Sequence, residues 1–235
     1  MDILKKIEIE TSNSVDDVYS YSFSSEHLEY KSSLKGFNEK IYTLFNTHYQ
    51  KLNISESICS LFKGDEVNQT ENQAALHHIY RDLNGDFKNN FSSNNLNENF
   101  HAIIEKCIDL KCDLKKKGIK NVVTIGIGGS FEGPKLLINA LTNIKDRNFN
   151  HIFLTGPDIN EFKEKVEHLN QEETFFIVSS KSFSTDETIQ GLNLSKNWLE
   201  SKCSFDDHFV AVTSQPKKAN LYGFKDNIFY FPNEI

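Results

Sequence analysis

A series of short apolar runs in the second part of the sequence constrains the fold more than any other feature. Five runs alternate with segments of helical periodicity, and they occupy residues 122–127, 152–155, 174–179, 209–213 and 228–231. Runs of this length and content are typical of strands that are buried on both faces of a parallel sheet. The alternation therefore predicts an α/β fold, a three-layer αβα sandwich around a five-stranded parallel sheet, with right-handed crossovers.

Residues 1–100 precede this pattern and are rich in Asn, Ser and Lys. We expect them to form a mainly helical N-terminal segment, followed by an α/β domain over residues 101–235. Thr70 and Gln73 have the spacing of a capping box, and apolar residues follow them at helical intervals, which predicts a helix over residues 68–80. Further helices are predicted at residues 101–117, 134–141, 160–169, 185–199 and 216–222.

The composition excludes several classes of function. The chain carries 26 Lys and Arg against 33 Asp and Glu, a net charge of −7, whereas nucleic-acid binding demands a basic surface. No apolar stretch approaches the length of a membrane span, so neither nucleic acid nor a membrane is an expected partner. The N-terminus lacks the apolar core of a signal peptide, and the four cysteines show no metal-ligand spacing. We therefore expect a cytoplasmic protein with reduced thiols and with no metal or other cofactor.

The first apolar run ends in a glycine turn, G-I-G-G-S at residues 126–130, and a helix is predicted to follow it. Two familiar phosphate-binding fingerprints fail on spacing. A dinucleotide fingerprint needs glycine at position 131, which is Phe131, and a P-loop starting at Gly128 needs lysine at position 134, which is Pro134. Two interpretations stay open: a structural tight turn, or an anion site made by backbone amides and the helix N-terminus.

The third apolar run ends in a segment rich in hydroxyl groups, S-S-K-S-F-S-T-D-E-T at residues 179–188. Seven consecutive residues carry five hydroxyls and one ammonium, and Ser184 and Glu187 have capping-box spacing. Hydroxyls, an ammonium group and a helix N-terminus together suit a phosphomonoester. The alternative is an ordinary helix cap rich in serine and threonine.

The two segments are more informative together than singly. They end the first and third predicted strands, which are neighbours in a doubly wound sheet of order 2-1-3-4-5. The loops after these strands then face one crevice at the switch point of the sheet, and a phosphorylated small molecule is the expected occupant.

The sequence resembles the glucose-6-phosphate isomerase (phosphoglucose isomerase) family in three segments that occur in the family's order. They are N-Q-T-E-N-Q-A-A-L-H at residues 68–77, I-G-I-G-G-S-F-E-G-P at residues 125–134, and the serine-lysine segment at residues 179–188. The likeness extends from about Asn68 to the last residue. Three ordered motifs are far more specific than a single glycine loop.

The resemblance implies a first sugar isomerase domain that binds glucose 6-phosphate and fructose 6-phosphate. The implied contacts to the sugar phosphate come from Gly129 and Ser130, and the residues implied to hold the phosphate are Ser180, Lys181, Ser182 and Thr185. The family reaction, part of glycolysis and gluconeogenesis, interconverts the two sugar phosphates through an enediol, and the full-length enzymes are homodimers. Four residues depart from the family pattern: Gln73, Phe131, Glu132 and Ser182, of which Ser182 keeps the hydroxyl of the family's threonine.

The resemblance also implies which catalytic groups lie elsewhere. The family's Glu, His and Lys belong to a second sugar isomerase domain that these 235 residues do not include. Isomerisation needs a base near the substrate carbon, and Glu132, Asp186 and Glu187 are better interpreted as helix-start carboxylates. We therefore expect no catalytic residue here, and expect an N-terminal portion that binds sugar phosphate without turnover. The alternative is a stand-alone, non-catalytic sugar-phosphate-binding module.

Overall fold

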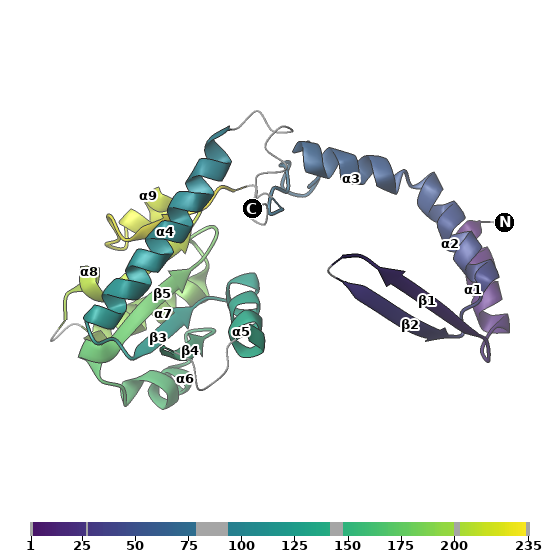
Figure 1. The fold of residues 1–235 in the computed structure, drawn as a ribbon. Coiled ribbons are helices and arrows are strands. Elements are labelled where there is room, and N and C mark those ends of the chain that lie inside the picture. Colours follow the sequence, from purple (N-terminus) through teal and green to yellow (C-terminus); the bar gives the residue numbers. More distant parts are fainter. Residues whose placement is uncertain (1, 27, 79–93, 142–147, 200–202, 234–235) are drawn as a thin grey trace. The chain divides into compact units, whose positions relative to one another are not determined.

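The computed structural model describes residues 2–26, 28–78, 94–141, 148–199 and 203–233. The chain forms two compact units, Met1–His78 and Ile79–Ile235, which are described separately below (Figure 1). The division at residues 100 and 101 that the sequence suggests stays a prediction. None of the described helices combines the length and the apolar character that a membrane crossing requires.

The first unit combines three helices with one β-hairpin. Its elements are α1 (Ile3–Asn13), β1 (Val18–Ser24), β2 (Glu29–Lys35), α2 (Glu39–Lys51) and α3 (Ile54–Lys63). The hairpin is antiparallel, and the ring of Tyr19 stacks on that of Tyr42 in α2 with centroids 5.7 Å apart. We did not predict this hairpin, although residues 19–24 alternate between aromatic residues and serine with the period of a strand.

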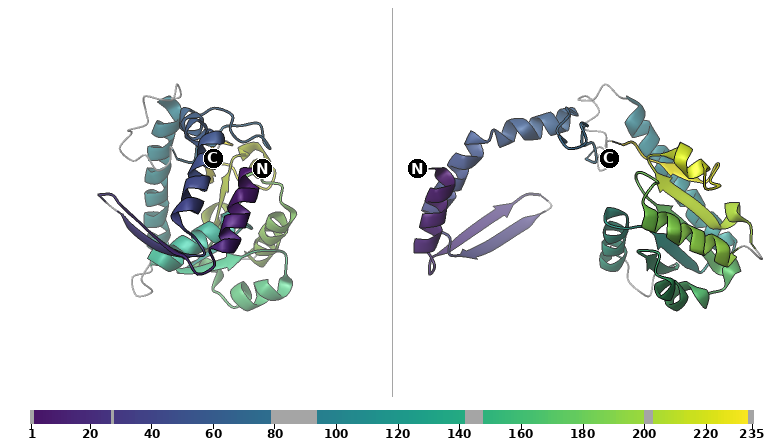
Figure 2. Two further views of the ribbon diagram at one scale, coloured as in Figure 1. Left: turned by 90° about the vertical axis from the view of Figure 1, so that its right-hand side faces the viewer. Right: turned by 180° about the vertical axis from the view of Figure 1, so that it is seen from behind.

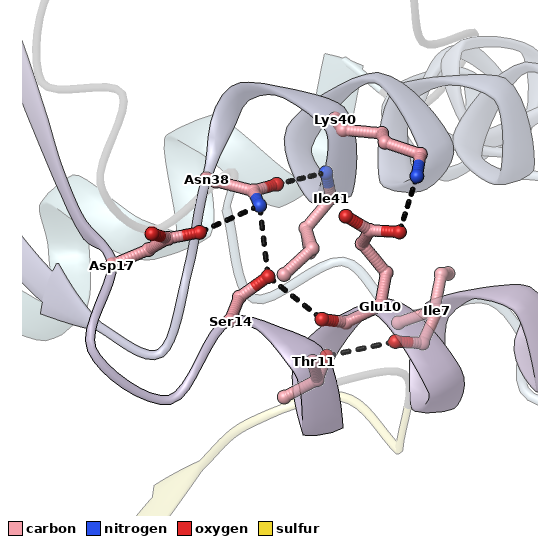
Figure 3. A network of polar contacts seen from close by, with 8 residues as sticks. All are labelled: Ile7, Glu10, Thr11, Ser14, Asp17, Asn38, Lys40 and Ile41. Atoms are coloured by element: carbon pink, nitrogen blue, oxygen red, sulfur yellow. Dashed lines mark hydrogen bonds and ion pairs between the residues drawn. The ribbon is translucent and has the colours of Figure 1, made fainter.

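A polar network joins α1 to α2 (Figure 3). Asn38 caps α2, because its side-chain oxygen accepts a hydrogen bond of 2.9 Å from the amide of Ile41. Its amide nitrogen donates to Ser14 at 2.8 Å and to Asp17 at 2.9 Å. Lys40 forms an ion pair with Glu10. These contacts set the start of α2 against the end of α1.

The helix predicted over residues 68–80 is wrong over its described part. Residues 68–78 form turns, and Asn68 and Gln73 pair in an isolated antiparallel bridge. The side chain of Asn68 accepts hydrogen bonds from the Thr70 hydroxyl at 2.7 Å and from the Glu71 amide at 3.4 Å. Such local bonds compete with a helix, and the positive φ of 51° at Asn72 cannot belong to one. Residues 79 and 80 lie outside the described residues.

The second unit contains the predicted sheet. Its strands are β3 (Asn121–Ile125), β4 (Asn150–Leu154), β5 (Thr174–Ser179), β6 (Phe209–Thr213) and β7 (Ile228–Tyr230). All four neighbouring pairs are parallel, and the spatial order is β4-β3-β5-β6-β7. This is the order 2-1-3-4-5, so the predicted doubly wound α/β fold is confirmed.

Helices cover both faces of this sheet (Figures 1 and 2). They are α4 (Asn94–Lys116), α5 (Gly129–Leu141), α6 (Ile159–Phe162), α7 (Asp186–Leu199), α8 (Phe205–His208) and α9 (Pro216–Asn220), with a π-helical turn Lys163–Glu167 and a 3-10 turn Gln171–Glu173. Adjacent residues of a strand enter opposite layers: Phe175 packs in a cluster with Leu114 of α4, and Phe176 in a cluster with Leu192 of α7. The short helix α8 is not among the predicted helices.

An exposed ion pair joins the end of α4 to α8. Lys117 and Asp207 are 2.6 Å apart, and both side chains are about half exposed. The hydrogen bond from Lys117, together with its charge, lowers the pKa of Asp207 below the ordinary aspartate value. A lowered carboxyl pKa stabilises the fold above the ordinary pKa, and this contribution disappears as the pH falls through the lowered value.

Lys117→Met is therefore expected to reduce the loss of stability on acidification. Because the pair is exposed, the difference should be below about 1 kcal/mol. It can be measured from urea unfolding at about pH 6 and about pH 3. Lys115→Met removes the same charge two residues earlier and should leave the pH dependence as in the unsubstituted protein. Identical profiles for the two variants would contradict the assignment.

Candidate phosphate-binding site

The loop after β3 is a tight turn that leads directly into α5. Gly128 has a φ of 53°, a left-handed conformation that glycine adopts without strain. The amides of Phe131 and Glu132 both donate to the Gly128 carbonyl, at 3.0 and 2.8 Å. Gly129 is the first residue of α5 and Ser130 the second, so both predicted contact residues lie at the N-terminus of this helix. A helix N-terminus attracts negative charge.

The loop after β5 presents hydroxyl groups around a buried aromatic residue. Phe183 is 1% exposed and packs edge-on against Phe224, and its φ of 46° turns the chain sharply. Ser180 is buried; its hydroxyl accepts a hydrogen bond of 3.1 Å from the Phe183 amide and lies 3.4 Å from the Thr185 hydroxyl. The structure thus places Ser180 and Thr185 together, at opposite ends of one turn.

Lys181 and Ser182 lie within this loop and are less buried than Ser180. The Lys181 carbonyl accepts hydrogen bonds from the amide of Ser214 at 3.2 Å and from the hydroxyls of Ser214 and Thr213 at 2.8 and 3.1 Å. The Ser182 carbonyl accepts one from the ammonium group of Lys218 at 3.1 Å. The loop backbone is therefore held by the next strand and by α9.

Three of these supporting residues were not predicted from the sequence: Thr213, Ser214 and Lys218. Thr213 ends the fourth apolar run, Ser214 follows it directly, and Lys218 belongs to the helix after it. The sequence did contain an indication of their role, because polar residues that follow a third neighbouring strand also lie at the carboxyl edge of the sheet. Lys218 adds a second cation next to the loop.

The two predicted loops meet at Gly126. A Cβ atom on this glycine would lie 2.9 Å from the Ser179 carbonyl oxygen and 2.9 Å from the Ser130 Cβ. The backbone after β3 thus passes directly against the end of β5, and only glycine fits. The structure therefore brings the starts of both loops together at the switch point. Whether the six predicted residues bind phosphate stays a prediction.

The chemistry gathered here suits an anion. Serine and threonine hydroxyls, a lysine and the N-termini of α5 and α7 all lie at the carboxyl edge of neighbouring strands. Among the residues that the structure describes, His, Cys, Asp and Glu side chains form no group of three or more that could hold a metal ion.

The sequence matches the family described as phosphoglucose isomerase over residues 31–235. The chain belongs to the phosphoglucose isomerase family. The match begins earlier than the likeness found from the motifs, and it includes part of the β-hairpin.

Relatives in this family show how much of a phosphoglucose isomerase the chain represents. It is 35% identical over 205 residues to glucose-6-phosphate isomerase of Legionella pneumophila and 32% identical over 222 residues to that of Coxiella burnetii. These alignments cover 84% and 88% of this chain but only 41% and 40% of the relatives. The chain therefore spans about two fifths of the length of these relatives.

A solved phosphoglucose isomerase has the same fold. The crystal structure of a glucose-6-phosphate isomerase from Chlamydia trachomatis matches this chain with a TM-score of 0.81 and 20% sequence identity. The match covers 100% of this chain and 48% of that one.

The structure also shows what the departures from the phosphoglucose isomerase pattern do. Phe131 packs edge-on against Phe153 of β4 with ring centroids 5.7 Å apart, and the ammonium group of Lys135 lies 4.5 Å above the ring of Phe131. Gln73 donates a hydrogen bond to the Glu71 carboxylate. Phe131 therefore packs the first turn of α5 against β4, and the hydrogen bond of Gln73 stabilises the turn at residues 68–73.

Proposed function

We propose that this chain is the sugar-phosphate-binding N-terminal portion of a glucose-6-phosphate isomerase. Its ligands are glucose 6-phosphate and fructose 6-phosphate, held by their phosphate group between the loops after β3 and β5. The contact at Gly126 is the observation that carries this proposal, because it brings the starts of the two loops together. Membership of the family supports the choice of ligand.

The proposal assigns binding, and not turnover, to these residues. Isomerisation of an aldose to a ketose needs a base close to the substrate carbon and an acid for the ring oxygen. Glu132, Asp186 and Glu187 all lie in the first turn of α5 or α7 and are exposed, which suits a helix-start role. The enediol chemistry of glycolysis and gluconeogenesis, the cytoplasmic location and the homodimer are proposed for the complete enzyme.

Ser180→Ala and Lys181→Ala are each expected to weaken glucose 6-phosphate binding by roughly 1–3 kcal/mol. This is the scale of one lost hydrogen bond to a charged group. Isothermal titration of the chain with glucose 6-phosphate measures the effect. Lys115→Ala is a matched control, because it removes the same charge at the end of α4 and should leave the affinity unchanged.

Two outcomes would contradict the proposal. Unchanged affinity in both Ser180→Ala and Lys181→Ala would show that the phosphate binds elsewhere. Isomerase turnover by residues 1–235 alone, followed in an assay coupled to fructose 6-phosphate formation, would show that a base is present in this chain. The expected result is binding of both sugar phosphates with no turnover.

A further inference from the structure

One hydroxyl group at the start of α7 is buried and has no hydrogen-bond partner in the part of the chain that the structure describes. Thr188 lies in the first turn of α7 and is 1% exposed, and its Oγ1 meets no donor or acceptor among the residues that the structure describes. Removing a hydroxyl from water without a compensating bond costs free energy. Buried polar groups are for this reason nearly always paired, so the exception at Thr188 calls for an explanation.

The same helix shows the ordinary arrangement further along. Ser195 is also fully buried, and its hydroxyl donates a hydrogen bond of 2.9 Å to the carbonyl of Gly191, four residues earlier. Serine and threonine within a helix commonly satisfy their hydroxyl in this way. For Thr188 the residue four positions earlier is Ser184, which precedes the helix, and that bond is not made.

The packing of α7 locates the Thr188 hydroxyl. A Cβ atom on Gly191 would lie 2.9 Å from the Ile125 side chain, so this face of α7 packs against the last residue of β3. Thr188 is on the same face, one turn closer to the N-terminus of the helix. Ile125 directly precedes Gly126, where the two loops meet. Since Cβ atoms in a helix tilt toward its N-terminus, the side chain of Thr188 is directed toward the carboxyl edge of the sheet, where both loops begin.

We propose that Thr188 is a further phosphate-binding residue. Its hydroxyl donates a hydrogen bond from below to a phosphate group held between the loops, either directly or through one water molecule. The bound phosphate then supplies the partner that the described residues do not provide. This inference rests on the proposed function, because it deepens the same site with an additional hydroxyl on the buried side of α7.

Thr188→Val and Thr188→Ser test the proposal. Valine keeps the shape of threonine without the hydroxyl, and serine keeps the hydroxyl. We expect valine to lower the affinity for inorganic phosphate and for glucose 6-phosphate by about three- to tenfold, and serine to keep both within about twofold. Without ligand, Thr188→Val should unfold at the same or a higher urea concentration, because a buried unpaired hydroxyl is removed.

Ser195→Ala provides the control on the same face of α7. It removes a buried hydroxyl that is already paired, so it should lower the stability and leave phosphate affinity unchanged. Equal phosphate affinity of Thr188→Val and the unsubstituted chain would overturn this inference alone. Loss of affinity in Thr188→Ser equal to that in Thr188→Val would overturn it as well. Failure of the unsubstituted chain to bind either probe would overturn the proposed function together with it.

Discussion

Gly126→Ala is expected to weaken glucose 6-phosphate binding roughly 100-fold. The new methyl group would lie 2.9 Å from the Ser179 carbonyl oxygen and from the Ser130 Cβ, and neither is the end of a flexible side chain. Overpacking of this kind costs roughly 1–3 kcal/mol unless the backbone moves, and here any movement separates the two loops. Several phosphate contacts would then be lost together, and the stability should fall by a similar amount.

Gly133→Ala is the matched control for this prediction. Gly133 lies in α5, and a Cβ atom there would meet nothing within 4 Å. Alanine is favoured over glycine within a helix by up to about 1 kcal/mol, but the ring of Pro134 disfavours helical backbone in a preceding residue that carries a Cβ. The two effects oppose each other, so this variant should bind as before with little change in stability. Titration with glucose 6-phosphate and urea unfolding of both variants provide the measurement. Full affinity in Gly126→Ala would show that the close approach of the loops is not needed.

Phe176→Ala is expected to lower the free energy of unfolding by about 3–5 kcal/mol, the usual cost of truncating a buried aromatic residue. Phe176 is fully buried in the centre of β5, its ring stacks on that of Phe209 with centroids 4.7 Å apart, and it packs edge-on against Trp198. Truncation leaves a cavity between the sheet and α7 that the neighbouring rings cannot fill without moving. Because β5 carries the serine-lysine loop at its end, phosphate affinity should fall with the stability.

Urea unfolding of three variants tests the role of Phe176. Phe176→Leu keeps most of the buried volume and should lower the free energy of unfolding clearly less than Phe176→Ala does. It can therefore be measured even if the alanine variant does not fold. Leu137→Ala removes an apolar side chain that is 58% exposed, and it should change the stability by less than about 0.5 kcal/mol. An unfolding midpoint of Phe176→Ala equal to that of Leu137→Ala would refute the central role of this ring.

The sheet could be predicted because its strands are buried on both faces. Such strands are continuous apolar runs, and the predicted strands at residues 174–179 and 209–213 agree with β5 and β6 residue for residue. The helix predicted over residues 68–80 was wrong over its described part. Thr70 and Gln73 do have capping-box spacing, but the side chain of Asn68 accepts hydrogen bonds from the Thr70 hydroxyl and the Glu71 amide instead. Local side-chain bonds of this kind are not distinguished from helix caps by spacing alone.

The meeting of the two loops at the switch point of the sheet could be predicted from the sequence, but the contacts that support the loop after β5 could not. The hydroxyls of Ser180 and Thr185 and the glycine turn stand out in the sequence, because each follows an apolar run and precedes a helix. The support from Thr213, Ser214 and Lys218 was missed, because these residues contact the loop through its backbone carbonyls. A carbonyl acceptor is present at every residue, so nothing in the sequence marks which one is used.

The sequence by itself determined the order of the five strands of the parallel sheet, the family of the chain and the residue types of the two loops. These properties depend on periodicity and on residue types that are close together in the chain. Only the tertiary structure decided that the loops touch at Gly126 and that the buried hydroxyl of Thr188 has no partner among the described residues. Both facts depend on the packing of α7 and β5 against β3, because a close approach or an unpaired hydroxyl arises from groups that are distant in sequence and adjacent in space.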